Sequence, residues 1–468
     1  MNEIADFIKN LREKPILIYG LGKSGISLAR MLHAAGAHVV TGDDNPENLE
    51  EAKKLNVEIY DNSARDFSEY AFVLLSPGIP FTHPKPHTIV DTAKEADVEI
   101  FCDVELFHRI YPNIKTIGVT GTNGKSTTAT LIHHILSECG VPSVLCGNIG
   151  TPVFDSDFSN PDAWVVVEIS SFQMDLCPTY RPDISAILNL TSDHIDRHGS
   201  MEQYAEVKER ITELSNSSDY NLTFLGADDD FTKKISDRAK GLGLRKVIDF
   251  SSERALASGT HVENGILYDV LDGYALSVGD ISEIPTLKGM HNYQNVACAY
   301  GITRKIGLPA ADIWKAIVSF PGLQHRQYLI RTINGVGYIN DSKSTNAAAA
   351  AVALGCRNNA YWIVGGRRKK NGLDGLEEFF PRIKHAFLIG EATEDFATWF
   401  DNYGMEYTRC YDLKKALSSA HEMAQENRGQ PGGAGVVLLS PACASFDQFR
   451  SFEDRGEQFT TLVNALEE

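Results

Sequence analysis

Short apolar runs alternate with helical patterns along nearly the whole chain of 468 residues. This alternation is typical of parallel strands joined by crossover helices, and not of an all-β protein or a helical bundle. The first runs lie at residues 15–19, 37–42 and 71–76, and comparable series begin near residues 115 and 329. The pattern therefore predicts an α/β protein built from successive parallel-sheet units.

Length and composition agree with several domains. A chain this long exceeds the usual size of one hydrophobic core. Its residues are 43% apolar and 23% charged, as in ordinary globular proteins. Pro321 and Gly322 lie in a segment that resembles a linker. We expect three domains, at residues 1–103, 104–322 and 323–468.

Charge and cysteine usage exclude some classes of protein. The net charge of −18 argues against nonspecific nucleic-acid binding, which needs a basic surface. The eight cysteines form no C-x-x-C pair and no zinc-binding pattern. The sequence has no signal-like N-terminus and no apolar stretch of membrane-spanning length. We expect a cytoplasmic protein with no membrane and no nucleic-acid partner.

The first glycine-rich loop, GLGKSG at residues 20–25, directly follows an apolar run. It matches the G-x-G-x-x-G fingerprint of a dinucleotide-binding fold, and Asp43 follows the next apolar run, where such folds keep a ribose-binding acid. The fingerprint alone is weak evidence for a particular ligand. An NAD-dependent oxidoreductase is therefore one hypothesis.

A second loop, TIGVTGTNGKSTT at residues 116–128, leads from an apolar strand through a glycine turn into a helix. Backbone amides of such a turn surround a phosphate, Lys125 would reach its outer oxygens, and Ser126 would place a hydroxyl on Mg²⁺. Val119 stands where G-x-x-x-x-G-K-[ST] has its first glycine, so the loop is a variant. ATP or GTP is predicted at Lys125, and an NAD enzyme would leave this loop unexplained.

Glu168 follows four apolar residues and is predicted at the carboxyl end of a strand. A phosphate loop needs an acid in that position on a neighbouring strand to hold its metal ion. The alternative is a solvent-exposed glutamate at a strand end. The order of the two motifs favours the metal ligand.

Three motifs, GTNGKST, EISSFQ and DHIDRH, occur in this order between residues 121 and 198. With them the chain resembles the Mur ligases, the ATP-dependent amino-acid-adding enzymes of peptidoglycan synthesis. SSFQ and SPACASFDQFRSFEDRG, at residues 440–456, are typical of the D-glutamate-adding branch. The resemblance covers essentially the whole chain. It implies an N-terminal Rossmann-like UDP-binding domain, a central phosphate-loop ATPase domain and a C-terminal Rossmann-like domain that binds the amino acid.

The resemblance implies ligation of D-glutamate to UDP-N-acetylmuramoyl-L-alanine. ATP would phosphorylate the alanyl carboxylate, and the amino group of D-glutamate would attack the acyl phosphate. Negative charge builds on phosphate and carboxylate oxygens, which calls for Mg²⁺, two ions in this family, and for cationic donors. The partners implied are these small molecules, bound by a monomer. Another amino-acid-adding Mur ligase and an ATP-driven switch protein stay open as alternatives.

The resemblance also implies catalytic residues and metal ligands. The catalytic residues would be Lys125, Glu168, His194, Lys208 and Lys343. The metal ligands would be Ser126, Glu168, His194 and Lys208, the last as a carbamate. A protonated lysine repels Mg²⁺, whereas a neutral amine that captures CO₂ becomes an anion. From the helix pattern alone, Lys208 lies on an exposed helix face.

Three sets of binding residues follow from the same resemblance. For ATP they are Gly121, Thr122, Asn123, Gly124, Lys125, Ser126, Thr127, Asn292, Asn295, Arg326 and Asp341. For the UDP-sugar, whose diphosphate GLGKSG would bind in place of NAD, they are Gly22, Lys23, Ser24, Asp43, Ser76, Gly78, Asn148, Ser170 and Gln173. For D-glutamate they are His194, Thr345, Lys369, Ser445 and Phe452. The sequence GGRRKKNG departs from the family pattern, so Arg367, Arg368 or Lys370 could take the role of Lys369.

Overall fold

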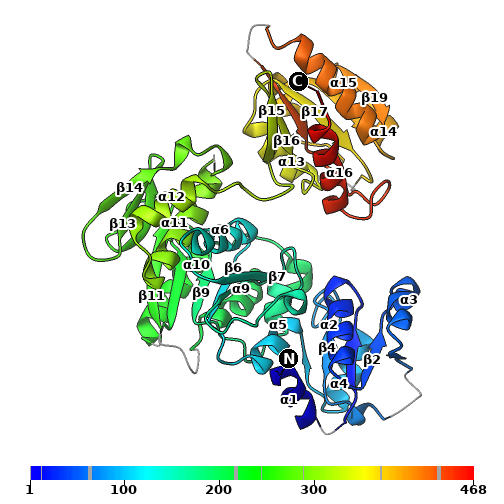
Figure 1. Ribbon diagram of the computed structural model, residues 1–468, viewed down its shortest axis with the longest axis vertical. Helices are drawn as coiled ribbons and strands as arrows, with labels where there is room; N and C mark the ends of the chain where they lie inside the picture. Colours follow the sequence, from blue (N-terminus) through cyan, green and yellow to red (C-terminus); the bar gives the residue numbers. More distant parts are fainter. Residues whose placement is uncertain are drawn as a thin grey trace. The chain divides into compact units, whose positions relative to one another are not determined.

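The computed structural model describes residues 2–11, 13–61, 66–214, 220–243, 245–287, 289–368, 372–429 and 434–467. The chain divides into two compact units, Met1–Ser282 with Met290–Ser319 and Glu283–Gly289 with Phe320–Glu468. The described residues form three sheets of five, nine and six strands. Figure 1 colours the chain along the sequence, from blue at the N-terminus to red at the C-terminus. The predicted α/β class is confirmed, because most neighbouring strands are parallel and helices connect them.

The first sheet has the strand order β3-β2-β1-β4-β5, and its strands are parallel. Its strands are β1 (Ile16–Tyr19), β2 (Val39–Gly42), β3 (Glu58–Ile59), β4 (Val73–Leu75) and β5 (Ile100–Phe101). Its helices are α1 (Asn2–Asn10), α2 (Lys23–Ala34), α3 (Pro46–Lys54) and α4 (Thr88–Glu95). The order changes direction between β1 and β4, and ligands of such sheets bind outside the carboxyl ends of the strands at that point. The loops at residues 20–25 and 76–79 follow these two strands.

The second sheet, in the same unit, has the order β14-β13-β12-β11-β10-β9-β6-β8-β7. Its strands are β6 (Thr116–Thr120), β7 (Ser143–Gly147), β8 (Trp164–Glu168), β9 (Ile184–Ile187), β10 (Leu222–Gly226), β11 (Lys246–Ser251), β12 (Gly259–Glu263), β13 (Ile266–Val270) and β14 (Leu276–Asp280). The last two strand pairs are antiparallel hairpins, as the Asn-Gly and Asp-Gly pairs at residues 264–265 and 272–273 indicate. In the parallel part of the sheet, strand β6 lies between β9 and β8.

The helices around the second sheet are α5 (Asp103–Ile110), α6 (Lys125–Glu138), α7 (Ser171–Asp175), α8 (Ile195–His198), α9 (Met201–Glu209), α10 (Asp230–Leu242), α11 (Met290–Ile306) and α12 (Ala310–Val318). Short 3₁₀ helices lie at Phe67–Glu69, Val153–Asp155, Arg210–Thr212, Ile281–Glu283, Pro285–Leu287 and Glu377–Arg382. The buried apolar residues of the first two sheets form a shared cluster, so the connection between these sheets is packed rather than open.

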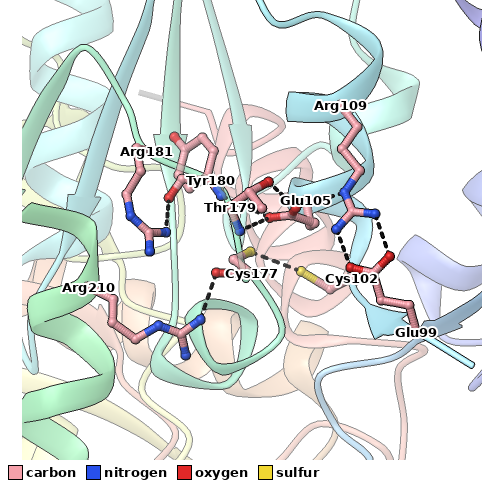
Figure 2. Close-up of polar contacts among 9 residues, drawn as sticks. All are labelled: Glu99, Cys102, Glu105, Arg109, Cys177, Thr179, Tyr180, Arg181 and Arg210. Atoms are coloured by element: carbon pink, nitrogen blue, oxygen red, sulfur yellow. Dashed lines mark hydrogen bonds and ion pairs between the residues drawn. The ribbon is translucent and has the colours of Figure 1, made fainter. Parts of the chain in front are cut away.

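A polar junction centred on the buried Glu105 joins α5 to the segment before β9 (Figure 2). The Glu105 carboxylate accepts the amide N–H groups of Thr179 and Tyr180 at 3.0 and 2.9 Å and Arg109 Nε at 2.8 Å. Arg109 also forms a two-pronged ion pair with Glu99, which directly precedes β5. Buried charges are stable when they are paired and hydrogen-bonded in this way. The junction therefore anchors the passage from the first sheet to the second.

The third sheet lies in the second unit and has the order β15-β16-β20-β17-β18-β19. Its strands are β15 (Tyr328–Ile333), β16 (Val336–Asn340), β17 (Ala360–Gly365), β18 (Ile383–Ile389), β19 (Tyr407–Tyr411) and β20 (Val436–Leu439). Its helices are α13 (Ala347–Gly355), α14 (Thr393–Tyr403), α15 (Leu413–Glu426) and α16 (Phe452–Asn464). The apolar run near residues 329–342 is an antiparallel hairpin of β15 and β16, because Asn334 and Gly335 form its turn with positive φ.

Helix α13 contains the alanine-rich run that follows Thr345. The Asn346 side chain accepts the Ala349 amide N–H at 2.8 Å, so Asn346 is the N-cap of this helix. Across the described residues, none of the helices is both long and apolar enough to cross a bilayer. The predicted domain limits near residues 103 and 322 stay a prediction.

Candidate functional site

The loop of residues 121–124 connects β6 to α6, and glycines with positive φ shape it. Gly121 has a φ of 146° and Gly124 a φ of 84°. A Cβ on Gly124 would lie 2.1 Å from Asn295 Oδ1, so any larger residue there would have to displace this asparagine and adopt a strained φ. On the other side, Asn189 accepts the amides of Thr122 and Asn123, each at 2.8 Å, through its backbone oxygen and its Oδ1. The loop is thus held by α11 and by the segment after β9.

Lys125 is the first residue of α6, and its side chain lies along the loop. Its Nζ donates to the carbonyl oxygens of Gly121 at 3.0 Å and Thr122 at 2.8 Å. Ser126 and Thr127, in the first turn of the same helix, are buried. An ammonium beside the N-terminus of a helix of 14 residues concentrates positive potential at one place. This arrangement suits a phosphate group.

Asn292 and Asn295 of α11 are brought to the phosphate loop. Asn295 Nδ2 donates to Asn292 Oδ1 at 3.1 Å, and Asn295 Oδ1 accepts Thr128 Oγ1 at 3.2 Å. Both asparagines are buried. These bonds connect α11 to α6. Contact of either residue with ATP stays a prediction.

Glu168 is the last residue of β8 and pairs with Val119 of β6 in the sheet register. It is 1% exposed, so the alternative of a solvent-exposed glutamate is wrong. Its Oε1 accepts Asn148 Nδ2 at 3.0 Å, whereas its Oε2 has no hydrogen-bond partner in the part of the chain described. A buried carboxylate oxygen without a partner is costly unless a cation neutralises it. The donor set therefore fits a metal ion beside the phosphate loop.

Lys208 of α9 is 1% exposed, so its expected position on an exposed helix face is wrong. The helix packs this face inward, where Lys208 Nζ donates to Thr120 Oγ1 at 3.0 Å and to the Gly121 oxygen at 3.1 Å. Burial, and secondarily the charge of Lys125, lowers the pKa of Lys208 well below its ordinary value, although Asp193 and Glu168 oppose this shift. A neutral amine is thus favoured beside the phosphate loop.

His194 directly precedes α8 and has a φ of 53°. Its side chain is 47% exposed and lies 3.4 Å from Asp193 Oδ2 and 4.8 Å, between ring centroids, from Phe172. In the described ranges, no three His, Cys, Asp or Glu side chains gather as a ready metal site. The predicted ligand set contains only Glu168 and His194 of these types. It therefore depends on Ser126 and on a carbamate at Lys208.

The residues predicted for the UDP-sugar gather at the first sheet and at β7 and α7. Asp43 Oδ2 accepts the Leu21 amide of the glycine loop at 2.5 Å, and its Oδ1 accepts the Asn45 amide at 2.8 Å. Gly22 is the N-cap of α2, which Lys23 and Ser24 begin. Asp43 therefore shapes the loop, whatever else it binds.

Ser170 and Gln173 form a capping box at α7, in which each side chain accepts the other's backbone amide at 3.2 Å. Asn148 follows β7 and donates to Glu168 as described above. These three residues therefore have structural partners. Their contact with a ligand stays a prediction.

In the second unit, the predicted residues follow three adjacent strands. Asp341, Lys343 and Thr345 follow β16, Ser445 follows β20, and Arg367 and Arg368 follow β17. The Lys343 Nζ lies 5.9 Å from the centre of the Phe452 ring. Carboxyl ends of neighbouring parallel strands meet at one sheet edge, so the structure gathers these residues.

The other predicted residues of this unit differ in their exposure to solvent and in their ion pairs. Arg326 is exposed and Ser445 is buried. Arg367 and Arg368 form ion pairs with Glu391 and Asp395 at 3.0 and 2.9 Å. Lys369 and Lys370 lie outside the described residues.

Asp341 is buried, and its carboxylate accepts the Gln327 amide at 3.1 Å and Ser440 Oγ at 2.7 Å. Burial raises the pKa of Asp341 from the ordinary 3.8 to about 7, although these hydrogen bonds oppose the shift. Between about pH 4 and pH 7 the Asp341 carboxyl is therefore protonated in the folded state and ionised in the unfolded chain. Stability should fall as the pH rises from about 4 to about 7.

Replacing Asp341 with asparagine should remove this dependence, because the amide does not titrate. At pH 8, above both pKa values, the variant should be more stable than the wild type by about 4 kcal/mol, with the difference vanishing near pH 4. Urea unfolding of both proteins between pH 4 and pH 8 measures this. Parallel stability curves for the two proteins would contradict it.

Sequence reasoning missed several residues that shape the site. Asn189 holds the phosphate loop, and Tyr204 Oη hydrogen-bonds Thr122 Oγ1 at 3.1 Å. Asn189 comes two residues after β9, so its position at a strand end beside β6 was the available signal. Tyr204 carried no such signal, because its partner is 82 residues away in the chain.

Two family models match the chain. The Mur ligase middle domain matches residues 119–303, and the N-terminal domain of the MurD-like Mur ligases matches residues 14–102.

Similar proteins cover the chain almost completely. The UDP-N-acetylmuramoylalanine–D-glutamate ligase of Rhizobium etli is 43% identical over 464 residues, 98% of this chain and 97% of that protein. The ligase of the same name from Paramagnetospirillum magneticum is 42% identical over 458 residues, 98% of each chain. The solved structure of UDP-N-acetylmuramate-alanine ligase from Thermotoga maritima shares the fold, with a TM-score of 0.58 at 16% identity over 97% of this chain and 99% of that one.

Proposed function

The chain belongs to the Mur ligase family, and we propose that it joins D-glutamate to UDP-N-acetylmuramoyl-L-alanine with the hydrolysis of ATP to ADP and phosphate. The relatives from Rhizobium etli and Paramagnetospirillum magneticum are named as ligases of this kind and align over 98% of this chain. We further propose a monomer in the cytoplasm, acting in peptidoglycan precursor synthesis. Its three domains would have the limits predicted from the sequence.

The observation that carries the proposal is the group of ionisable side chains around the phosphate loop, of which Lys208 and Glu168 are buried. Lys125 lies along the loop, Lys208 Nζ bonds the Gly121 oxygen at 3.1 Å, and the Glu168 Oε2 has no partner in the described part of the chain. Two lysines and one carboxylate around a single loop are suited to transfer of a phosphoryl group. They have no evident purpose in hydride transfer.

The residues of this group fit a divalent cation. Ser126 and Glu168 would hold one Mg²⁺ at the phosphate loop, and His194 with carbamylated Lys208 would hold a second. When bound, Mg²⁺ offsets the negative charge of the phosphates and of the acyl phosphate. Lys125 would orient the γ-phosphate and stabilise the charge that develops on it as the alanyl carboxylate attacks. Loss of ADP would leave an acyl phosphate. The amine of D-glutamate would attack its carbonyl carbon, and the amide would form as phosphate leaves and the amine loses a proton.

The second unit would supply the amino-acid side of the reaction. The carboxylates of D-glutamate call for cationic and hydroxyl donors, which Lys369, Ser445 and Thr345 provide. Arg326, Asp341 and Lys343 would bind nucleotide or the reacting oxygens. Arg367 and Arg368 are each paired with an acid, so either one would have to leave that partner to take the role of Lys369.

The test is phosphate release from ATP with UDP-N-acetylmuramoyl-L-alanine and Mg²⁺, measured with a panel of D- and L-amino acids. Turnover with D-glutamate only is the expected result. Turnover with a different amino acid would keep the ligase chemistry and contradict the assignment of the D-glutamate residues. Release that needs neither acceptor would instead favour an ATP-driven switch protein.

A further inference from the structure

Arg197 of α8 reaches three consecutive carbonyl oxygens in the loop after β4. Its Nη1 donates to the Gly78 oxygen at 3.0 Å, and its Nη2 donates to the oxygens of Pro77 and Ile79 at 3.2 and 3.0 Å. One side chain beside the second sheet therefore holds a loop of the first sheet. Ser76 and Gly78 of this loop are among the residues proposed for the UDP-sugar.

Two prolines limit the backbone hydrogen bonding of this segment. Pro77 and Pro80 have no N–H group, so a regular ladder of backbone hydrogen bonds cannot extend through this segment. Its own turn is closed by one bond, from the Ile79 amide to the Ser76 oxygen at 3.0 Å. Three bonds to a charged guanidinium are thus a large part of its hydrogen bonding.

The supported loop packs directly on the glycine loop. Gly20 has a φ of 96°, and a Cβ on it would lie 2.4 Å from Ser76 Cβ and 2.8 Å from Ile79 Cδ1. Movement of residues 76–79 would therefore disturb residues 20–25. Both sides of the proposed diphosphate site are thus in contact through the loop to which Arg197 donates.

The other contacts of Arg197 lie toward the reacting groups. Its guanidinium carbon is 4.4 Å from the centre of the Phe172 ring, and the same ring is 4.8 Å from that of His194. Phe172 lies between Ser170 and Gln173 of the capping box. Burial lowers the pKa of Arg197 and Asp196 opposes this, yet a guanidinium stays protonated in proteins. The side chain thus contacts the loops of the UDP-sugar site on one side and the neighbourhood of His194 on the other.

We propose that Arg197 is a positioning residue that holds the loop of residues 76–79, and through it the glycine loop, in the geometry that binds the UDP-sugar. The inference rests on the proposed function, since that function identifies the ligand. Arg197 acts through backbone carbonyls and contacts no reacting atom. Loss of Arg197 should therefore weaken binding of the UDP-sugar and leave the binding of ATP unchanged.

The test compares Arg197→Ala, Arg197→Lys and the wild type in steady-state turnover. The alanine variant should raise the KM for UDP-N-acetylmuramoyl-L-alanine by about tenfold or more, with the KM for ATP changed by less than about twofold. The KM of the lysine variant for the UDP-sugar should lie between those of the wild type and the alanine variant, because an ammonium cannot donate to several carbonyl oxygens with the planar geometry of a guanidinium. Added ethylguanidinium should lower the raised KM of the alanine variant. Arg210→Ala is the matched control, since Arg210 donates to the Cys177 oxygen at 2.9 Å, away from this loop.

An unchanged KM for the UDP-sugar in Arg197→Ala, or equal rises in both KM values, would overturn the proposal. Hydrogen–deuterium exchange of the peptide at residues 72–87 separates it from the proposed function. Faster exchange there in the variant than in the wild type would support the holding role even if no turnover is found with D-glutamate. Unchanged exchange would overturn it. If the alanine variant does not fold, Arg197→Lys supplies both measurements.

Discussion

Replacing Lys125 with alanine should lower ATP-dependent phosphate release by on the order of 10³-fold. The side chain lies along the phosphate loop, 3.0 and 2.8 Å from the carbonyl oxygens of Gly121 and Thr122. A phosphate bound by the loop amides would draw this ammonium to its outer oxygens, where charge develops during transfer. Turnover at saturating ATP measures the loss of rate. Titration with a fluorescent ATP analogue measures how much the affinity for ATP has fallen.

Two comparisons make this result specific. Lys246→Ala removes an exposed lysine of the same unit and should retain full activity. Lys125→Arg keeps the charge but not its compact shape, so it should recover only part of the rate. Full turnover by Lys125→Ala would show that the glycine loop binds something other than the reacting phosphate.

Replacing Lys208 with alanine should lower activity by on the order of 10²–10³-fold, and short carboxylates such as formate or acetate should restore part of it. The reason is that Lys208 is buried with a lowered pKa, so a neutral amine is available to capture CO₂. The resulting carbamate is an anion that a small carboxylate can replace. A direct measurement is the carbamate carbon signal in an NMR spectrum of protein equilibrated with ¹³C-bicarbonate, which the variant should lack.

The pH dependence provides a further check on Lys208. Since its pKa is lowered, the amine stays neutral to lower pH than an ordinary lysine, and the carbamate should be lost as the pH falls through that lowered pKa. Lys233→Ala, an exposed lysine of α10, is the control and should keep both activity and pH profile. A Lys208→Ala variant that is inactive, and that carboxylates do not restore, would favour a structural lysine.

Much of the fold was predictable because its signals are local. The alternation of apolar runs and helical patterns predicted parallel strands. The Asn-Gly and Asp-Gly pairs at residues 264–265 and 272–273 are local signals for the turns of the two hairpins. The capping role of Asn346 is also a local signal, since it depends on a residue three positions away. Glu168 was placed correctly at a strand end, but its burial was not local information. Burial depends on β6, β7 and Asn148, which lie on other parts of the chain.

The α/β class, the two glycine loops and the residue types that phosphoryl chemistry requires were predictable from the amino-acid sequence, because each depends on neighbouring residues. Which ionisable side chains are buried together depends instead on the tertiary structure. Lys208 belongs to a helix whose pattern indicated exposure, yet it lies against Thr120, 88 residues earlier. Arg197 holds a loop 118–120 residues away. Such contacts depend on how the strands order within their sheets, and that order is set by packing over the whole chain rather than by any local pattern.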